Sequence, residues 1–337
     1  MKRYYRPITQ IDPCRPDGAL TLAGGWAWFD RIEEITRTGT RLISAQDAPQ
    51  DILDRLTAPR APMAGVPLDR PTVMGILNVT PDSFSDGGAH DAPDQALDHA
   101  RHMVEQGADL IDVGGESTRP GAAWVPVEEE QARIAPVIRR IRSEMAVPIS
   151  VDTRKAPVAQ AAIAAGANIV NDVSGFTFDP ALADYCARHH IPVMLMHTQG
   201  EPQVMHLAPR YDNVLLDVYD FLEERVAHAE SLGLTRDQIV IDPGIGFGKT
   251  LEHNLLLLNR ISLFHALGCG ILLGVSRKRF IGTIGNAPDP RDRAAGSVSV
   301  ALHAVMEGVQ ILRVHDVAET RSALSLWRAV SDGCVSG

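Results

Sequence analysis

The stretch that decides the fold is LIDVGGESTRPG, at residues 110–121. Leu110, Ile111 and Val113 form a short apolar run that is typical of a buried strand. Asp112 interrupts this run, and an ionised carboxylate in a buried strand is costly unless another group pairs with it. Two glycines then lead into a polar loop. The order is an apolar strand, a buried polar residue, a glycine-rich exit and a polar loop, and it recurs along most of the chain.

Eight strand-and-helix units follow residue 70. Short apolar runs predict strands at residues 73–79, 110–113, 148–152, 168–171, 191–196, 238–242, 270–275 and 310–314. Helical periodicity predicts helices at residues 92–106, 128–144, 156–165, 180–189, 213–232, 251–267, 293–307 and 317–330. Strands that alternate with helices favour parallel packing, and eight units over roughly 260 residues predict an α/β fold, a (β/α)8 TIM barrel. A doubly wound open sheet is the alternative.

Residues 1–70 differ from this pattern and predict a small N-terminal extension, with the barrel over residues 71–337. Within the extension, residues 19–29 indicate a strand and a turn, residues 30–38 indicate a short helix, and the proline-rich residues 58–62 indicate a linker. We expect the extension to form either a flanking subdomain or a cover over one end of the barrel.

Composition argues against several classes of protein. The 337 residues carry 42 acidic and 32 basic side chains, and the net charge of −10 gives no basic footprint for nucleic acid. No apolar run approaches the roughly 20 residues of a membrane span, and the N-terminus lacks the apolar run of a signal peptide. The four cysteines are scattered, which argues against disulfides and a structural zinc site. We therefore expect a soluble, cytoplasmic protein that binds neither nucleic acid nor membranes.

Polar residues near the strand ends point to the function, because the carboxyl ends of barrel strands meet at one mouth, where active sites lie. The acceptors are Asp112, Asp152, Asn171 and Asp242, and the cations are Arg119, Lys278, Arg313 and His315. The acceptors suit a planar heterocycle with several N–H donors, and the cations suit a phosphate or diphosphate. Asn78, a neutral oxygen donor, suits a Mg²⁺ ion that phosphates mostly hold. Helix capping explains any one of these residues about as well, but it does not explain the set.

The sequence IDPGIGFGKT, at residues 241–250, imitates a phosphate-binding P-loop without meeting its spacing. A Walker A motif requires a glycine five residues before Gly248, and Pro243 stands there. Gly244, Gly246 and Gly248 also miss the G-x-G-x-x-G spacing. These glycines favour a tight bend or a close approach to a ligand, and NTPase activity is not predicted.

Seven motifs together resemble the dihydropteroate synthase family of pterin-binding barrels. They are MGILNVTPDSFSDGG (residues 74–88), IDVGGESTRPG (111–121), SVDT (150–153), NDVSG (171–175), DPGIGFGK (242–249), SRK (276–278) and RVHDV (313–317). The resemblance covers about residues 71–330. It implies a transferase of folate biosynthesis that condenses 6-hydroxymethyl-7,8-dihydropterin diphosphate with 4-aminobenzoate, giving 7,8-dihydropteroate and diphosphate. It also implies that sulfonamides compete at the aminobenzoate site.

The resemblance also implies a role for each matching residue. Asp152, Asn171, Asp242 and Lys278 would hold the pterin, with Met196 nearby. Asn78, Arg313 and His315 would bind the diphosphate, with Mg²⁺ at Asn78. Thr118, Arg119, Pro120, Phe247, Ser276 and Lys278 would frame the aminobenzoate, and the predicted catalytic residues are Asp112, Asp152, Lys278 and Arg313. The resemblance further implies a homodimer through the later barrel helices.

Two other functions share part of this pattern. A pterin-binding barrel that passes methyl groups between a folate and a corrinoid protein would share the ring pocket, but it needs neither the diphosphate-binding cations nor the STRP loop. A non-catalytic paralogue would be expected to lose polar residues at the mouth, and none is missing. Preferential binding of methyl-tetrahydrofolate would indicate the first alternative, and an absence of turnover would indicate the second.

Overall fold

The computed structural model describes residues 1–80, 92–117, 124–200 and 209–334. Eight parallel strands close into a barrel, in which each strand pairs with the next along the chain and the last pairs with the first. They are β6 (Thr72–Asn78), β7 (Leu110–Gly114), β8 (Ile149–Asp152), β9 (Ile169–Asp172), β10 (Val193–Met196), β11 (Ile239–Asp242), β12 (Gly270–Gly274) and β13 (Ile311–Val314). The predicted (β/α)8 barrel is confirmed, and the open sheet is excluded because β6 and β13 are paired.

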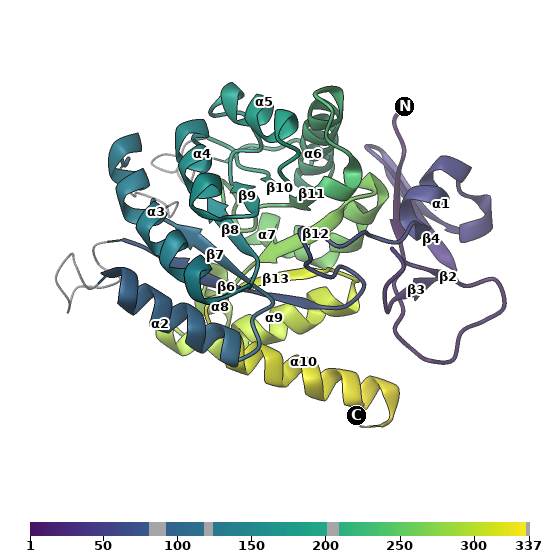
Figure 1. Ribbon diagram of the computed structural model, residues 1–337. Helices are drawn as coiled ribbons and strands as arrows, with labels where there is room; N and C mark the ends of the chain where they lie inside the picture. The colour runs from purple at the N-terminus through teal and green to yellow at the C-terminus, as the bar shows by residue number, and fades with distance from the viewer. Residues whose placement is uncertain (81–91, 118–123, 201–208, 335–337) are drawn as a thin grey trace.

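Helices surround the barrel strands (Figure 1). They are α2 (Ala92–Glu105), α3 (Val127–Glu144), α4 (Ala156–Ala165), α5 (Pro180–Arg188), α6 (Val214–Ser231), α7 (Leu251–Asn259), α9 (Ala294–Met306) and α10 (Val317–Asp332). The helix predicted over residues 251–267 is interrupted at Arg260 and continues as a 3-10 helix, η4 (Ile261–Leu267). A short helix, α8 (Arg279–Ile284), has no counterpart in the prediction. Among the helices of the described residues, none is both long and apolar enough to cross a lipid bilayer.

Local sequence sets several helix ends. The Asn213 side chain accepts a hydrogen bond from the Leu216 amide at the start of α6, and Thr250 accepts one from the His253 amide at the start of α7. Gly166 ends α4 at φ +114°, a left-handed conformation that a side chain would disfavour. These caps fix where the loops of the barrel meet the flanking helices.

Alternate residues of each strand point into the barrel, and their character changes along the strand. Near the amino ends, these positions hold apolar side chains of one buried cluster: Met74, Leu110, Ile169, Met194, Val240, Leu272 and Ile311. Two residues further along, four of these strands hold a polar side chain: Asp112, Asn171, Asp242 and Arg313. Asp152 is the last residue of β8. The same strand faces therefore form core at one end of the barrel and present polar groups at the other.

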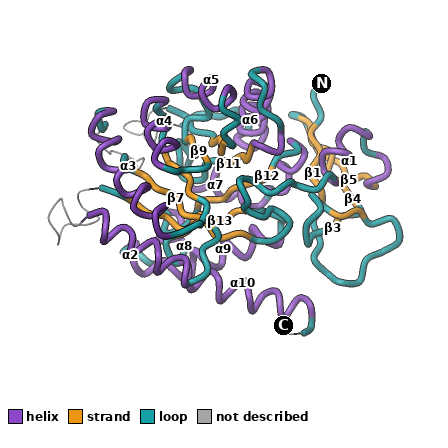
Figure 2. The backbone as a smooth tube through the Cα atoms, viewed as in Figure 1, coloured by secondary structure: helices purple, strands orange, loops and turns teal. Residues whose placement is uncertain are grey.

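The N-terminal part of the chain lies beside the barrel (purple in Figure 1). Its elements are an antiparallel sheet of β1 (Tyr4–Pro7), β4 (Arg31–Thr36) and β5 (Gly39–Ser44), a hairpin of β2 (Leu20–Thr21) and β3 (Trp28–Phe29), and α1 (Gln50–Thr57). Figure 2 shows these short strands grouped together, apart from the barrel strands. The hairpin matches the strand and turn predicted over residues 19–29.

Polar and apolar contacts join the extension to the barrel. Trp26 Nε1 donates to the Val305 carbonyl at 2.8 Å, and the Glu33 carboxylate accepts from Arg6 Nε at 2.7 Å and from Arg260 Nη2 at 3.1 Å. Three apolar residues that precede β6 join the buried cluster inside the barrel: Met63, Val66 and Leu68. These three residues therefore pack against the apolar side chains at the amino end of the barrel.

The short helix predicted at residues 30–38 is wrong, because this segment contains β4, the central strand of the extension's sheet. Ile32 and Ile35 are three residues apart, as on one face of a helix, and both are buried, but so is Glu33 between them. β1 and β5 pair with β4 on its two sides, and two arginines compensate the buried carboxylate of Glu33. Tertiary pairing thus overrides the local spacing.

Candidate functional site

Polar residues from four strands meet at the carboxyl-end mouth of the barrel. Arg313 donates from Nε to Asp112 Oδ2 at 2.6 Å and from Nη2 to Asp152 Oδ2 at 2.9 Å. Asn171 Nδ2 donates to the same Asp112 oxygen at 3.2 Å, and the Ser150 hydroxyl donates to the other. Asp112 is fully buried, so Arg313 and these hydrogen bonds compensate its charge.

Asp152 keeps one oxygen for another donor. Its Oδ2 bonds Arg313, whereas its Oδ1 is buried and has no hydrogen-bond partner among the described residues. Burial raises the pKa of Asp152 to about 7, Arg313 opposes the rise, and Asp112 adds to it. Because an unpartnered buried acceptor is costly, this oxygen is suited to an N–H group that a ligand brings.

A second group of side chains lies where β11 and β12 end. Asp242 is buried, and its Oδ1 accepts a hydrogen bond from the Gly244 amide at 2.7 Å. Lys278 donates to the Ile245 carbonyl, and its Nζ lies 4.6 Å from the centre of the Phe247 ring, which is a cation–π distance. Burial lowers the pKa of Lys278 to about 8 and raises that of Asp242, and each group limits the shift of the other.

The loops after β12 and β13 are tied together. The Ser276 hydroxyl accepts a hydrogen bond from the His315 amide at 3.1 Å and lies 3.0 Å from His315 Nδ1. Arg277 is in the left-handed conformation at φ +58°, and its Nε donates to Asp316 Oδ2 at 3.1 Å. Asp316 therefore engages Arg277, which leaves Lys278 as the cation of the SRK motif near Asp242.

The remaining predicted residues end barrel strands or lie outside the described chain. Asn78 is the half-buried last residue of β6, and Met196 is the buried last residue of β10, where it pairs in register with Asp242. Thr118, Arg119 and Pro120 lie outside the described residues. Every predicted site residue that the structure describes thus lies in the carboxyl-end half of a barrel strand or in the loop that follows it.

Three residues near the mouth have no role in the sequence prediction. Ser150 bonds the buried Asp112, and Lys249 Nζ lies 2.9 Å from His197 Nδ1. Ser150 stands two residues before Asp152, so strand alternation could have placed both on one face. Lys249 closes the DPGIGFGK motif, and its position there is the signal that could have identified it.

The described residues offer a divalent cation few ligands. They contain no group of three or more His, Cys, Asp or Glu side chains that could hold a metal ion. Arg313 engages both Asp112 and Asp152, whereas Asn78 supplies a neutral amide oxygen at the end of β6. This donor set fits Mg²⁺ where the phosphate groups of a substrate supply most of the ligands, which is a common arrangement for this ion.

Acceptors and cations therefore share one mouth. Asp152, Asn171 and Asp242 offer buried polar groups to a ring that is rich in N–H donors. Arg313 and Lys278 offer positive charge in a partly buried setting, where charge-assisted hydrogen bonds are stronger than in water. Such a mouth can hold a planar nitrogen-rich ring and compensate the charge of an attached anionic leaving group.

Comparison with known proteins agrees with this arrangement. The family of pterin binding enzymes matches residues 74–315. Dihydropteroate synthase of Escherichia coli (strain K12) is 47% identical to this chain over 262 residues, which make up 78% of this chain and 92% of that relative. The residues that the family model matches include every predicted site residue, from Asn78 to His315.

Two solved structures are similar in both sequence and fold. Xanthomonas albilineans dihydropteroate synthase with 4-aminobenzoic acid has a TM-score of 0.74 and 49% identity, covering 78% of this chain and 94% of that one. Yersinia pestis dihydropteroate synthase with a sulfonamide drug complex has a TM-score of 0.74 and 45% identity, covering 79% and 96%. The barrel, its mouth and these likenesses together show that the chain belongs to the dihydropteroate synthase family of pterin-binding enzymes.

Proposed function

We propose that the carboxyl-end mouth condenses 6-hydroxymethyl-7,8-dihydropterin diphosphate with 4-aminobenzoate, giving 7,8-dihydropteroate and diphosphate. Membership of the dihydropteroate synthase family makes the protein a transferase of this kind. The observation that carries the assignment of residues is Asp152 Oδ1, which is buried and has no hydrogen-bond partner within the described parts of the chain. Asp152 stands in register with Asn171, and its other oxygen bonds Arg313. An acceptor for the ring and a cation for the leaving group are thus adjacent.

The pterin ring would be held by Asp152, Asn171, Asp242 and Lys278, with Met196 packed nearby. The two carboxylates offer buried acceptors, and a carboxylate can accept two parallel hydrogen bonds from neighbouring N–H groups. Asp112 has a different part in this scheme. It is fully buried and bonds both Asn171 and Arg313, so it orients the groups that touch the substrate.

The diphosphate would be bound by Arg313, His315 and Asn78. Two carboxylates fix the direction of the Arg313 guanidinium, which stays charged at all working pH values. Mg²⁺ would be held by Asn78 and chiefly by the phosphate oxygens, and when bound it neutralises charge on the leaving group. These cationic groups favour departure of the diphosphate.

The aminobenzoate would be framed by Thr118, Arg119, Pro120, Phe247, Ser276 and Lys278. Phe247 and Lys278 together present an aromatic ring and an ammonium group, which suit the ring and the carboxylate of this substrate. Because the similar Yersinia pestis protein is solved with a sulfonamide drug complex, we infer that sulfonamides compete at the same place here.

The reaction needs no covalent bond to the protein. The C–O bond between the pterin methylene and the diphosphate breaks, and its electron pair leaves with the diphosphate. The lone pair of the amine forms the new C–N bond, and the amine proton passes to solvent. Arg313 and His315 stabilise the charge of the departing anion, and the carboxylate of Asp152 favours the positive charge left on the ring. Because the amine is a weak nucleophile, departure of diphosphate before attack fits this arrangement.

The test is turnover by the purified full-length chain with pterin diphosphate, Mg²⁺ and 4-aminobenzoate. Diphosphate release that depends on 4-aminobenzoate is expected, with dihydropteroate as the second product. Arg313→Ala should reduce kcat/KM by orders of magnitude, whereas Arg321→Ala, which breaks an ion pair with Asp109 at the amino end of the barrel, should not. Folded protein that releases no diphosphate would contradict the reaction, and equal losses in both variants would contradict the role of Arg313.

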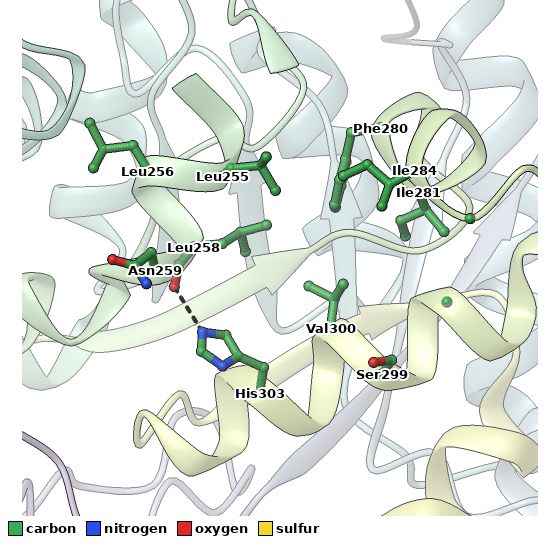
Figure 3. Close-up of a pocket in the computed structure, with 12 residues that line it drawn as sticks. Leu255, Leu256, Leu258, Asn259, Phe280, Ile281, Ile284, Ser299, Val300 and His303 are labelled. Carbon is green, nitrogen blue, oxygen red and sulfur yellow. Dashed lines mark hydrogen bonds between the residues drawn. The ribbon is translucent and has the colours of Figure 1, made fainter. Parts of the chain in front are cut away.

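We further propose a homodimer through the face formed by α7, α8 and α9. A cavity of about 690 Å³ opens there, and apolar side chains line much of it, among them Leu255, Leu256, Ile284 and Val300 (Figure 3). Ile284 is 59% exposed and Leu255 is 42% exposed, and apolar side chains gathered in a hollow mark an interaction surface. A second copy of the chain would cover this face with the same face, as two-fold interfaces do.

Ile284→Glu tests the homodimer, because a charge placed in an apolar interface is left without a partner. Light scattering should report a dimer for the wild type and a monomer for this variant. Leu326→Glu is the matched control, since Leu326 is 65% exposed on α10 and does not line the cavity. A wild type that stays monomeric at micromolar concentration contradicts the proposal.

We also propose that residues 1–70 form a subdomain that covers the amino end of the barrel and takes no part in the chemistry. In support, the family match begins at residue 74, and Met63, Val66 and Leu68 pack inside the amino end of the barrel.

A cytoplasmic location stays a prediction. It is supported by the four cysteines, all of which are free, because disulfides are rare in reducing compartments.

A further inference from the structure

Lys249 is a half-buried basic residue that the proposed chemistry does not use. It follows Gly248 in the segment that imitates a P-loop, and its Nζ lies 2.9 Å from His197 Nδ1, 3.0 Å from the Phe247 carbonyl and 3.4 Å from the His197 carbonyl. The next residue, Thr250, caps α7. Internal contacts therefore engage the Lys-Thr pair of the GKT sequence, which suits a structural use better than the binding of a phosphate.

The loop between β11 and α7 packs very closely on the chain that follows β10. A Cβ added to Gly244 would lie 1.9 Å from the His197 carbonyl oxygen, and one added to Gly248 would lie 2.5 Å from the Gln199 carbonyl oxygen. Both glycines also have positive φ angles, 68° and 59°. The glycines permit this close contact, and Lys249 joins its two sides by bonding Phe247 on one and His197 on the other.

The same loop determines where Lys278 lies. Its Nζ donates to the Ile245 carbonyl and lies 4.6 Å from the centre of the Phe247 ring. A Cβ added to Gly246 would lie 3.1 Å from Lys278 Cδ, so the side chain runs across the loop backbone. A shift of the loop would therefore move both Phe247 and the Lys278 ammonium.

The surroundings of Lys249 suit a fixed hydrogen-bonding role. Burial lowers the pKa of Lys249 well below its usual value, Lys278 lowers it further, and Asp242 opposes the change. Burial also lowers the pKa of His197 well below its usual value, and the cation Lys249 adds to this effect. A neutral His197 can accept at Nδ1 the hydrogen bond that Lys249 donates.

We propose that Lys249 is a positioning residue, which holds the Phe247 carbonyl against His197 and so sets the place of the Phe247 ring and of Lys278 for 4-aminobenzoate. The inference rests on the proposed roles of Phe247 and Lys278 at that substrate. Asp152 and Asn171 are held by Arg313 and Asp112 instead, on other strands. Lys278 and Asp242 contact the loop and would also hold the pterin, but the other two pterin-holding residues do not depend on it. Binding of the pterin ring should therefore depend on Lys249 less than binding of 4-aminobenzoate does.

Lys249→Met tests the proposal, because it removes the ammonium and keeps an unbranched side chain of similar length. KM for 4-aminobenzoate should rise about tenfold or more, and KM for the pterin diphosphate should change less than about threefold. Arg60→Met is the matched control: Arg60 is a buried cation that also donates to backbone carbonyls, those of Cys269 and His265, at the far end of the barrel. It should lower Tm and leave both KM values unchanged.

Several outcomes overturn the proposal. It fails if folded Lys249→Met keeps both KM values within about twofold of the wild type, or changes them no more than Arg60→Met does. If Lys249→Met does not fold, His197→Phe replaces it, since this variant removes the Nδ1 acceptor and retains a ring against Phe221, whose centre lies 4.9 Å from that of His197. An unchanged KM for 4-aminobenzoate in His197→Phe also overturns the proposal.

Phe247→Ala, measured in parallel, separates this proposal from the one on which it rests. If Phe247→Ala leaves the KM for 4-aminobenzoate unchanged, the proposed role of Phe247 fails. If Phe247→Ala raises this KM and Lys249→Met does not, the role of Phe247 stands and the positioning role of Lys249 fails.

Discussion

The two ends of the barrel use the same strand faces in opposite ways. At the amino end, Met63, Val66 and Leu68 of the extension close over the apolar cluster that includes Leu110 and Ile311. At the carboxyl end, two residues further along the same strands, the buried Asp112 forms an ion pair with the half-buried Arg313. One end therefore removes apolar area from water, whereas the other places charge where burial is costly.

Each end also contains a buried polar group, and the two differ in how fully they are bonded. Arg60, at the amino end, donates to the backbone carbonyls of Arg55, Ala58, His265 and Cys269. Asp152, at the mouth, keeps one oxygen without a partner among the described residues. A group in which every nitrogen is bonded, such as Arg60, indicates a structural role, and a group with an unused atom indicates a ligand. The comparison predicts that variants at the two ends alter different measurable quantities.

The largest effect is expected from Asp152→Asn. The amide keeps the size of the side chain but loses the charge and one acceptor, so kcat/KM should fall about a thousandfold. The free energy of unfolding should change by about 1 kcal/mol or less, because burial already disfavours the carboxylate. Steady-state kinetics and urea denaturation measure the two quantities. Near-wild-type turnover would contradict the assignment of Asp152 at the carboxyl end to ligand binding.

Met63→Ala should have the opposite pattern. Met63 is 1% exposed in the apolar cluster, and its truncation should lower the free energy of unfolding by about 2–4 kcal/mol. Because the side chain is far from the mouth, kcat/KM should stay within about twofold of the wild type. Leu42→Ala is the control, since Leu42 is 56% exposed in the same extension and should cost little. A loss of activity in folded Met63→Ala would show that the two ends are coupled.

The pH dependence of kcat/KM sharpens the description of the mouth. The pKa of Asp152 is about 7, and below it the protonated carboxyl binds the ring less well, so the rate should fall as pH decreases. The pKa of Lys278 is about 8, and above it the ammonium loses its proton, so the rate should fall as pH increases. Each limb should approach about tenfold per pH unit. If kcat/KM changed by less than about tenfold on either side between about pH 5 and pH 10, both roles would be contradicted.

The smallest effect is expected from Arg37→Ala. Arg37 pairs with Asp217 and Asp220 of α6 at 2.8 and 2.9 Å, and its side chain is 44% exposed. Exposed ion pairs contribute less than about 1 kcal/mol, so the free energy of unfolding should hardly change. The free energy of unfolding of this variant is measured at low and high salt and compared with that of Met63→Ala. A loss as large as that of Met63→Ala would show that charges, rather than the apolar closure, attach the extension.

The barrel could be predicted from the sequence because its information is local. Each strand is a short apolar run, and each polar residue near its end, such as Asp152 or Asp242, follows that run directly in sequence. The barrel topology then brings the strand ends together without further information from the side chains. For this reason the candidate site residues could be named before their distances were known.

The rest depends on partners that are distant in sequence. Glu33 in β4 is compensated by Arg260, and no local pattern reveals this pairing, so the segment could be mistaken for a helix. Lys249 bonds His197, which is 52 residues earlier, and spacing alone could not indicate that contact. Asp112 could be expected to have a partner, but that Arg313 supplies it follows only from the pairing of β13 with β6.

The contacts of the extension have a consequence for the order in which the protein can mature. During synthesis, residues 1–70 leave the ribosome before the barrel does, yet Trp26 bonds the carbonyl of Val305 and Arg60 bonds that of Cys269. These docking positions do not exist until most of the chain has been translated. The apolar surface of the extension therefore stays uncovered until the region around Val305 has been made. We expect truncated nascent chains to be held by chaperones until the region around Val305 has emerged.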